Sequence, residues 1–413
     1  MHGSTREEGG AAMTDRFEAT DARQVEEVVR WAAAEETPLE IVGHGSKRGT
    51  GRPVQAAHTL DLSKLSGVTL YEPEELVLSA KAGTPLAEIE ALLASRNQQL
   101  AFEPMDYGPL FGSERGKGTI GGVLAANLSG PRRLKAGAAR DHILGVHAVS
   151  GRGEAFKSGG RVVKNVTGYD LSKGLAGSWG TLAVVTDLTF KVLPAAETEV
   201  TFVLRGLLDE DAARAMALAM GSSAEVSGAA HLPYAIASRV AGGALGEEAA
   251  TLLRVEGFGP SVAARVALLR GLLGAAAPVE EIGGERSQVL WRDIRDCIPF
   301  ADSSERPVWR VSMPPADGHA MVYALRKQVA AEAFYDWQGG LIWLRLESDA
   351  EADLVRRLVR THGGGHATLV RASPAVRTAV PVFDPQPPAL AALSARLKAE
   401  FDPNAILNPG RMG

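Results

Sequence analysis

Two glycine-dense loops constrain the fold of this chain more than any other feature. The first reads Ile-Val-Gly-His-Gly-Ser-Lys-Arg-Gly-Thr-Gly over residues 41–51, and the second reads Gly-Thr-Ile-Gly-Gly-Val-Leu-Ala-Ala-Asn over residues 118–127. Residues without a Cβ let the backbone curl, so that several N–H groups point at one anion. Two such loops, each following an apolar or strand-like segment, suggest a dinucleotide whose pyrophosphate is held from two sides.

Composition narrows the classes of function. The chain has 413 residues, a net charge of −5 and scattered basic residues. This length predicts two or three domains, and the charge pattern argues against binding of nucleic acid or of an anionic membrane surface. The single cysteine, Cys297, excludes an intramolecular disulfide and a cysteine-ligated zinc or iron–sulfur site within the chain. We expect Cys297 to be a buried structural thiol rather than a flavin-linking or redox group.

No segment has the length and apolarity of a membrane span, which takes about 20 consecutive apolar residues. Residues 1–12 lack the apolar core of a signal peptide and are expected to form a disordered leader that ends at residue 13, with Met13 as an alternative start. The expected location is the cytoplasm, either free or held peripherally on the inner membrane through partners.

The two halves of the chain differ in their secondary-structure pattern. In the first half, Asp21 is placed to cap a helix over 22–36, and Gly151-Arg152-Gly153 joins two strands as a hairpin. In the second half, apolar strand candidates alternate with amphipathic helices, as in a helix-backed, largely antiparallel α+β layer. Residues 283–288 are expected to form a loop, and residues 388–400 a terminal helix.

Other nucleotide and hydrolase sites fail on spacing. Gly43-x-Gly45 is followed three residues later by Arg48 rather than glycine, so the Rossmann fingerprint is absent. No glycine-lysine-serine/threonine triplet and no G-x-S-x-G elbow occurs, which argues against a Walker P-loop and a serine hydrolase. An FAD site built from loops between strands remains.

Two further segments carry a family resemblance. Residues 159–181 read Gly-Gly-Arg-Val-Val-Lys-Asn-Val-Thr-Gly-Tyr-Asp-Leu-Ser-Lys-Gly-Leu-Ala-Gly-Ser-Trp-Gly-Thr, and residues 401–411 read Phe-Asp-Pro-Asn-Ala-Ile-Leu-Asn-Pro-Gly-Arg. With the two glycine loops, they resemble the vanillyl-alcohol-oxidase type, or PCMH-type, FAD-binding family. Residues 253–258, 309–314 and 339–344 resemble stretches of the E-type subunits of bacterial glycolate oxidases within that family.

The resemblance implies an α+β fold, with a PCMH-type FAD-binding domain of two subdomains followed by an α+β cap domain. It implies a leader over 1–13, an FAD-binding domain over 14–194, a cap or substrate domain over 195–385, and a C-terminal helix and tail over 386–413 that return to the FAD domain. The residues that it implies for FAD binding are Val42, Gly43, His44, Gly45, Ser46, Lys47, Arg48, Gly118, Thr119, Gly121, Gly122, Ala125, Asn127, Val163, Lys164, Asn165, Gly168, Tyr169, Asp170 and Asn408.

One departure from the family concerns how FAD is attached. Many relatives bind it covalently through a histidine just after the two central glycines of the first loop. Ser46 takes that position here, whereas His44 lies between Gly43 and Gly45. We therefore expect non-covalent FAD, with His44 as a loop side chain near the ADP portion.

Oxidation of a 2-hydroxy acid needs a cation for the carboxylate and a base for the hydroxyl proton. Arg254, Arg310 and Arg345 recur at similar places on predicted strands. Glu256 and Glu347 lie two residues after the first and third and could neutralise them, so Arg310 is the first choice as a catalytic residue.

His362 and His366 are the candidate bases, and His231 is expected to be structural. The segment 362–366 reads equally well as a flexible functional loop or as a helix C-cap followed by a strand. D-type relatives carry a late histidine- and glutamate-rich metal segment that is missing here, so no metal site is expected.

The sequence thus predicts an FAD-binding subunit of a glycolate oxidase or dehydrogenase complex. The expected reaction converts glycolate, a small 2-hydroxy acid, to glyoxylate, with partners that comprise a second, D-type FAD-binding subunit and an iron–sulfur subunit that takes the electrons. The alternatives are a non-catalytic scaffold subunit of that complex and a stand-alone FAD-dependent alcohol or hydroxy-acid oxidase.

Overall fold

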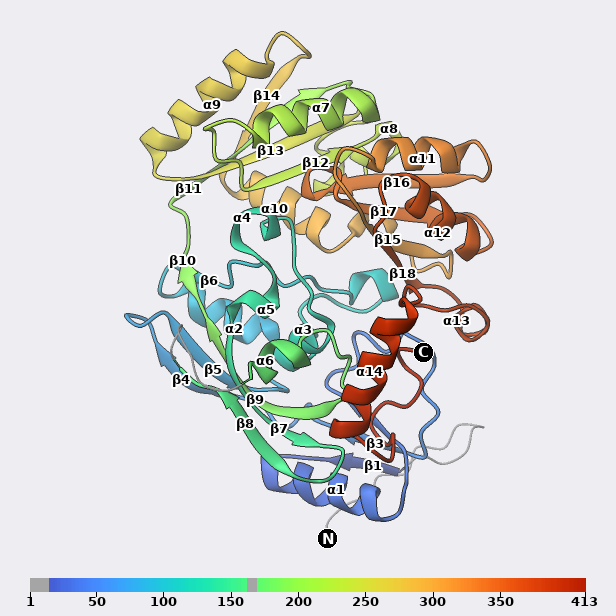
Figure 1. Ribbon diagram of the computed structural model, residues 1–413. Helices are drawn as coiled ribbons and strands as arrows, with labels where there is room; N and C mark the ends of the chain where they lie inside the picture. Colours follow the sequence, from blue (N-terminus) through green and yellow to red (C-terminus); the bar gives the residue numbers. More distant parts are fainter. Residues whose placement is uncertain (1–14, 162–168) are drawn as a thin grey trace.

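The computed structural model describes residues 15–161 and 169–413 (Figure 1). The expected leader and four of the expected cofactor-binding residues, Val163, Lys164, Asn165 and Gly168, lie outside this described part. Within it, no helix combines the length and apolarity that crossing a bilayer requires.

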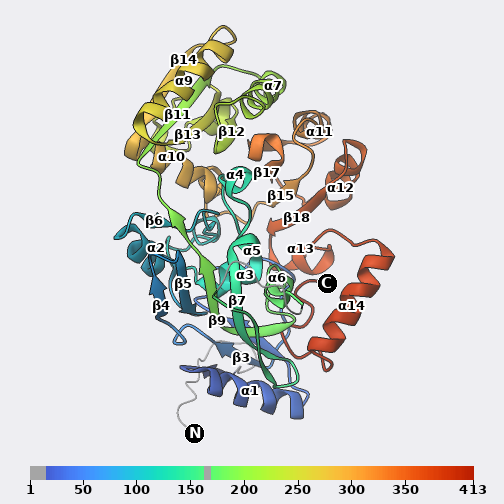
Figure 2. The ribbon, with the colours of Figure 1, turned by 60° about the vertical axis from the view of Figure 1, so that its left-hand side comes forward.

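The first half of the chain forms two sheets side by side at the lower end of the molecule (Figures 1 and 2). A parallel sheet in the order β1-β3-β2 comprises β1 (Asp15–Glu18), β2 (Leu39–Val42) and β3 (His58–Asp61). An antiparallel sheet in the order β4-β5-β9-β7-β8 comprises β4 (Val68–Glu72), β5 (Val77–Lys81), β7 (Ile143–Ser150), β8 (Ala155–Gly159) and β9 (Ala183–Lys191). These sheets are the two subdomains of the expected FAD-binding fold.

Short helices fill the space around these sheets. They are α1 (Ala22–Ala34), α2 (Leu86–Ala94), α3 (Ile120–Ala126), α4 (Arg133–Ala136), α5 (Ala139–His142) and α6 (Leu171–Leu175). As predicted, Asp21 caps α1, and its carboxylate accepts a hydrogen bond of 2.9 Å from the Gln24 backbone. Strands β6 (Gln98–Gln99) and β10 (Leu193–Pro194) pair where the chain leaves this half.

The second half forms one antiparallel sheet of eight strands, in the order β14-β11-β13-β12-β16-β17-β15-β18. The strands are β11 (Thr198–Arg205), β12 (Gly228–Leu232), β13 (Ala250–Gly257), β14 (Val279–Gly283), β15 (Val308–Ser312), β16 (Ala331–Asp336), β17 (Leu341–Leu346) and β18 (His366–Arg371). The helix-backed antiparallel layer expected from the sequence is confirmed.

The two faces of this sheet pack against different partners. Helices α7 (Asp209–Met220), α9 (Gly259–Leu273), α11 (Gly318–Arg326) and α12 (Ala352–Thr361) cover the outer face (Figure 1). The inner face shares a core with Met105, Tyr107 and Leu110 of the lower half. Sheet residues on the inner face therefore point towards the expected FAD domain.

The remaining helices are α8 (Tyr234–Ala237), α10 (Gly284–Arg295), α13 (Pro374–Ala379) and α14 (Pro388–Phe401), together with the 3-10 turns η1 (Pro109–Phe111), η2 (Ala241–Gly243), η3 (Ile298–Phe300) and η4 (Trp337–Gly339). The loop expected at 283–288 is wrong, because α10 begins at Gly284. The buried apolar stripe of this helix, Leu290, Trp291 and Ile294, lies beyond residue 288, so residues 283–288 alone do not reveal it.

We propose domain boundaries at 14–194, 195–385 and 386–413, since each sheet lies within one of these segments. The last segment runs along the lower half through α14, so the C-terminus returns to the first domain (Figure 1).

A cluster of buried charges ties the two halves together. The two terminal guanidinium nitrogens of Arg254, Nη1 and Nη2, donate to Glu103 of the lower half at 2.8 and 2.9 Å. Arg254 lies on the inner sheet face. Arg132 lies between Glu103 and Glu256 and donates to Glu256 at 2.6 Å. Burial alone would raise the pKa of Glu103, but Arg132 and Arg254 outweigh burial and lower it.

This cluster makes a prediction about stability. Glu103→Gln leaves two buried guanidiniums short of a countercharge and should lower the free energy of unfolding by about 3–5 kcal/mol. Glu210→Gln removes a carboxylate from an exposed pair with Arg214 and should cost about 1 kcal/mol or less. Urea unfolding measures both, and equal effects of the two variants would contradict the structural role of Glu103.

Candidate cofactor and substrate site

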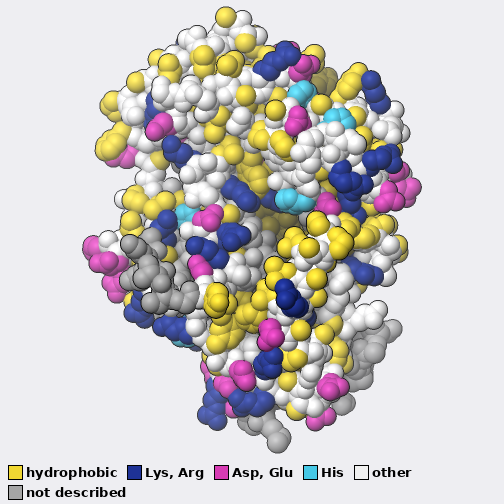
Figure 3. All heavy atoms as spheres, viewed as in Figure 1, with side chains coloured by type: hydrophobic (Ala, Val, Ile, Leu, Met, Phe, Trp, Pro, Cys, Tyr) yellow, Lys and Arg dark blue, Asp and Glu magenta, His cyan; other side chains and the backbone are white. Residues whose placement is uncertain are grey.

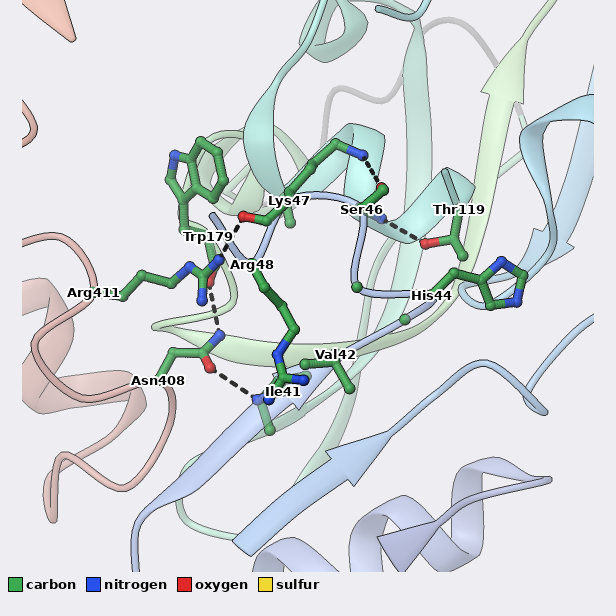
Figure 4. Close-up of a pocket in the computed structure, with 14 residues that line it drawn as sticks. Ile41, Val42, His44, Ser46, Lys47, Arg48, Thr119, Trp179, Asn408 and Arg411 are labelled. Atoms are coloured by element: carbon green, nitrogen blue, oxygen red, sulfur yellow. Dashed lines mark hydrogen bonds between the residues drawn. The ribbon is translucent and has the colours of Figure 1, made fainter. Parts of the chain in front are cut away.

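The two glycine loops meet in the structure, as the sequence predicts. A Cβ added to Gly43 would lie 2.8 Å from Oγ1 of Thr119, so the loops touch at this point. A pocket of about 480 Å³ lies between them, lined by residues of both loops and by Trp179, Asn408 and Arg411 (Figure 4). Segments distant in sequence therefore converge on one hollow.

The first loop offers a run of unused backbone donors. Among the described residues, the N–H groups of residues 43–47 have no hydrogen-bond acceptor. Gly45 has a φ of +76°, a conformation that L side chains rarely adopt and that turns successive N–H groups toward one side. This geometry suits an anion with several oxygens, such as a pyrophosphate.

Lys47 adds a buried cation to the same pocket. Its ammonium lies 3.4 Å from Oγ of Ser46, and a Cβ added to Gly122 would lie 3.4 Å from Nζ. Burial lowers the pKa of Lys47 to about 8, although Asp106 opposes the shift. No carboxylate of the described residues lies within ion-pair distance of this ammonium. The backbone N–H groups of residues 43–47 and the Lys47 ammonium therefore have no anionic partner among the described residues.

The second loop uses the backbone donors of its two adjacent glycines within the chain. Gly121 and Gly122 were expected to bind the cofactor, but their N–H groups donate to the Ala82 carbonyl at 2.9 Å and to Oγ1 of Thr119 at 3.2 Å. A Cβ added to Gly121 would lie 2.7 Å from the Ala82 carbonyl oxygen. These glycines let α3 sit close to β5, which leaves room for Lys47 beside Gly118 and Gly122.

The C-terminal tail closes the pocket from the far end of the sequence. Asn408 donates to the Trp179 carbonyl at 2.9 Å and accepts from the Ile41 backbone at 2.8 Å. Arg411 donates to the Lys47 carbonyl at 2.9 Å, and burial lowers the pKa of Arg411 to about 10. Sequence reasoning selected Asn408 but missed Trp179 and Arg411, which lie within segments quoted for the family resemblance.

A second hollow, of about 540 Å³, adjoins the first and shares Val42, Thr119, Ala125 and Asn408 with it. Its other walls are mainly apolar and include Leu62, Leu175, Ala183, Val184 and Val185. A pocket with three basic side chains, Lys47, Arg48 and Arg411, beside a mainly apolar pocket suits a dinucleotide, whose phosphates and rings need different surroundings.

The other expected cofactor residues divide into two groups: His44 and Arg48 line the first pocket, whereas Gly118, Asn127, Tyr169 and Asp170 line neither pocket. Nδ1 of His44 donates to the Lys117 carbonyl at 2.9 Å, and the side chain points away from Lys47 (Figure 4). Arg48 pairs with Glu40 at the rim. Asn127 caps α3. Tyr169 is exposed, and Asp170 caps α6.

The three arginines considered for the substrate carboxylate lie on the inner sheet face, but only one has no acidic partner. Arg254 pairs with Glu103 and Glu256, and Arg345 pairs with Glu332 and Asp302 rather than with Glu347. The side chain of Arg310 makes no ion pair or hydrogen bond with the described residues. Its guanidinium carbon lies 4.9 Å from the ring centre of Trp337, and burial lowers its pKa.

The candidate histidines separate in space. His362 ends α12, and its Nδ1 lies 2.8 Å from the Leu358 carbonyl of the same helix, which favours the helix-cap interpretation. His366 begins β18 and sits where burial and Arg310 lower its pKa. His231 is buried, with Nδ1 2.9 Å from Oγ1 of Thr251.

Sequence reasoning missed a carboxyl near Arg310. Asp336 ends β16, and one of its oxygens accepts from the Trp337 backbone at 2.7 Å. Burial raises the pKa of Asp336 to about 7, partly offset by Arg254 and Arg310. No motif marks this residue, because its environment arises from the fold.

Lys47 gives a direct test of the anion pocket. Lys47→Met should weaken FAD binding by roughly 10- to 100-fold, since a charge-assisted contact is lost from a buried site. FAD affinity of the unchanged protein should fall as pH rises above about 8, because Lys47 loses its proton there, and the variant should lack this dependence. Fluorescence titration with FAD measures both effects.

The control for this test is Lys117→Met, which removes an exposed lysine from the neighbouring loop. This control should leave both the affinity and its pH dependence unchanged. FAD binding by Lys47→Met that matches the unchanged protein would contradict the assignment.

Asn408 tests the role of the tail. Asn408→Ala removes two side-chain hydrogen bonds that hold β2 and residue 179 together, and should weaken FAD binding by about 1–3 kcal/mol. Asn404→Ala, in the same tail, removes only an exposed bond to α1 and serves as the matched control. Equal flavin content in both purified variants would show that the tail does not shape the pocket.

Comparison with known proteins agrees with this geometry. Residues 16–159 match the family described as FAD binding domain, so FAD is the cofactor of this half. The 4-ethylphenol oxidase from Gulosibacter chungangensis superposes with a TM-score of 0.72 at 14% identity over 98% of this chain and 90% of its own. A p-cresol methylhydroxylase superposes with a TM-score of 0.71 at 15% identity over 97% of this chain and 88% of its own. Both likenesses show the PCMH-type fold.

A relative in sequence covers nearly the whole chain. The glycolate oxidase subunit GlcE of Escherichia coli strain K12 is 35% identical over 387 residues, which are 94% of this chain and 95% of the relative. The aligned residues span both halves of the chain, so they include the eight-stranded sheet of the second half as well as the FAD pocket. The chain therefore belongs to the family of the glycolate oxidase subunit GlcE.

Proposed function

We propose that this chain is the FAD-binding subunit of a complex that oxidises a small 2-hydroxy acid, with glycolate converted to glyoxylate. The chain is an FAD-dependent oxidoreductase of a family that acts on CH–OH groups. The observation that supports the substrate class is Arg310, a cation that forms no ion pair with the described residues and lies on the sheet face that turns towards the FAD domain.

The residues of the first loop fit the pyrophosphate of FAD. Residues 43–47 would donate their free N–H groups, and Lys47 would supply the countercharge. Trp179, Asn408 and Arg411 would close the pocket from the other side. Ser46 replaces the histidine that many relatives use for covalent attachment, so the FAD is held without a covalent bond.

Arg310 would hold the substrate carboxylate. A guanidinium presents two parallel N–H donors that match the two oxygens of a carboxylate, and a site screened from water strengthens the pair. FAD, when bound, supplies the acceptor for the hydride that leaves the hydroxyl-bearing carbon. The hydroxyl proton needs a base, and His366 and Asp336 are the two groups near Arg310 that can accept a proton at neutral pH.

Partners would take the electrons onward. Cys297 is the only cysteine and is buried, and no group of three or more metal-binding side chains occurs in the part of the chain that the structure describes. We therefore propose an iron–sulfur partner and a second, D-type FAD-binding subunit. The printed name of the relative, a glycolate oxidase subunit, supports a multi-subunit assembly.

Arg310 provides the test of this function. In the assembled complex, Arg310→Gln should lower kcat/KM for glycolate by roughly 10- to 100-fold, and Arg310→Lys should retain part of the activity. Arg357→Gln removes an exposed arginine from α12 and should have no effect. The measurement is the rate at which glycolate bleaches the flavin absorbance at about 450 nm under anaerobic conditions.

Flavin content shows that each variant still binds FAD. A wild-type complex that glycolate does not bleach would contradict the proposed substrate. An Arg310→Gln complex that is bleached at the wild-type rate would contradict the role of Arg310.

A further inference from the structure

A second arginine shares the surroundings of Arg310. Arg133 lies in α4 of the lower half, and its guanidinium carbon is 4.5 Å from the ring centre of Trp337. The guanidinium carbon of Arg310, from β15 of the upper half, lies 4.9 Å from the same ring centre. The ring of Trp337 thus makes a cation–π contact with one arginine from each half of the molecule.

Both arginines lack an acidic partner. Within residues 15–161 and 169–413, the side chains of Arg133 and Arg310 form no ion pair and no hydrogen bond. Most other partly buried arginines here do: Arg132, Arg254, Arg295 and Arg345 each pair with one or two carboxylates. The described residues therefore balance these two charges only at longer range, through Asp141 near Arg133 and Asp336 near Arg310.

The two cations repel each other, which adds to the cost of keeping them without an anion. Burial lowers the pKa of Arg133, and Arg310 lowers it further. The same two arginines act with burial to lower the pKa of His366. The aromatic face of Trp337 offsets part of this cost.

Trp337 is held rigidly between the halves. Its indole N–H donates to the Gly130 carbonyl at 3.0 Å, three residues before Arg133, and its backbone N–H donates to Asp336. Lys, Arg and His side chains gather around the hollow between the upper and lower parts of the molecule (Figure 3). Trp337 thus brings the two cations together at the junction of the two halves.

We propose that Arg133 and Arg310 form a dianion site, in which each guanidinium takes one carboxylate of a small 2-hydroxydicarboxylic acid. This inference rests on the proposed function, because it assigns a substrate class to the same site. One carboxylate would balance only one of the two cations, whereas a dicarboxylate balances both. Arg133 is then the residue that separates dicarboxylates from monocarboxylates.

The test uses malonate and acetate, two unreactive probes that differ by one carboxylate. Calorimetric titration of the FAD-loaded protein should show malonate binding at least about tenfold more tightly than acetate. Arg133→Gln should remove that preference, with malonate weakened about tenfold and acetate nearly unchanged. Arg133→Lys, which keeps the charge, should restore part of the preference.

The control is Arg140→Gln, which removes an exposed cation from the next helix, α5. It should leave the affinities of both probes unchanged. Equal binding of malonate and acetate by the wild-type protein would overturn the proposal, as would an Arg133→Gln variant that loses both probes to the same extent, because that result indicates a structural role.

A kinetic arm separates this inference from the proposed function. If the assembled complex oxidises 2-hydroxymalonate with a lower KM than glycolate, and Arg133→Gln reverses the order, the dianion site is supported. A complex that oxidises glycolate but shows no malonate preference keeps the proposed function and loses the inference. A complex that prefers malonate to acetate but oxidises no 2-hydroxy acid keeps the dianion site and loses the proposed function.

Discussion

The first glycine loop carries hydrogen-bond donors and a buried cation that have no anionic partner among the described residues, and the account of the FAD site depends on them. Five successive backbone N–H groups, at residues 43–47, and the buried ammonium of Lys47 face one pocket without an acceptor or a countercharge among the described residues. Of these residues only Lys47 is buried, and burial of its ammonium without a carboxylate close by lowers its pKa. In the proposed site, the pyrophosphate of FAD would accept from these N–H groups and balance this charge.

The same logic recurs at the junction of the two halves. Most buried arginines there pair with carboxylates, which fixes the cap sheet on the FAD domain through Glu103 and Arg254. The side chains of the half-buried Arg133 and Arg310 form no ion pair or hydrogen bond with the described residues, and both contact Trp337. Paired charges thus link the two halves, and we propose that the two arginines without such partners among the described residues bind ligands. Because each half supplies one of these cations, the proposed substrate site would require the interface to be formed.

Local patterns in the sequence predicted many features of the fold and of the FAD site. Features that arise when distant segments pack together could not be predicted in this way. The loops at 41–51 and 118–127, the Asp21 cap and the antiparallel cap layer follow from glycine spacing, capping and hydrophobic period. Arg310 could be singled out because its strand lacks a nearby acid. The partners of Arg345, the proximity of Arg133 and the burial of Asp336 depend on how distant segments pack, which a linear pattern does not record. The donors of Gly121 and Gly122 were misjudged because α3 sits close enough to β5 for Ala82 to accept one of them.

The measurement that tests the central claim most directly compares FAD with riboflavin, which has the same ring system but no phosphate. If the amides of residues 43–47 and Lys47 bind a pyrophosphate, the protein stripped of flavin should bind FAD at least about a hundredfold more tightly than riboflavin. Pyrophosphate alone should then compete with FAD. Equal affinity for FAD and riboflavin, with no competition by pyrophosphate, would contradict the account.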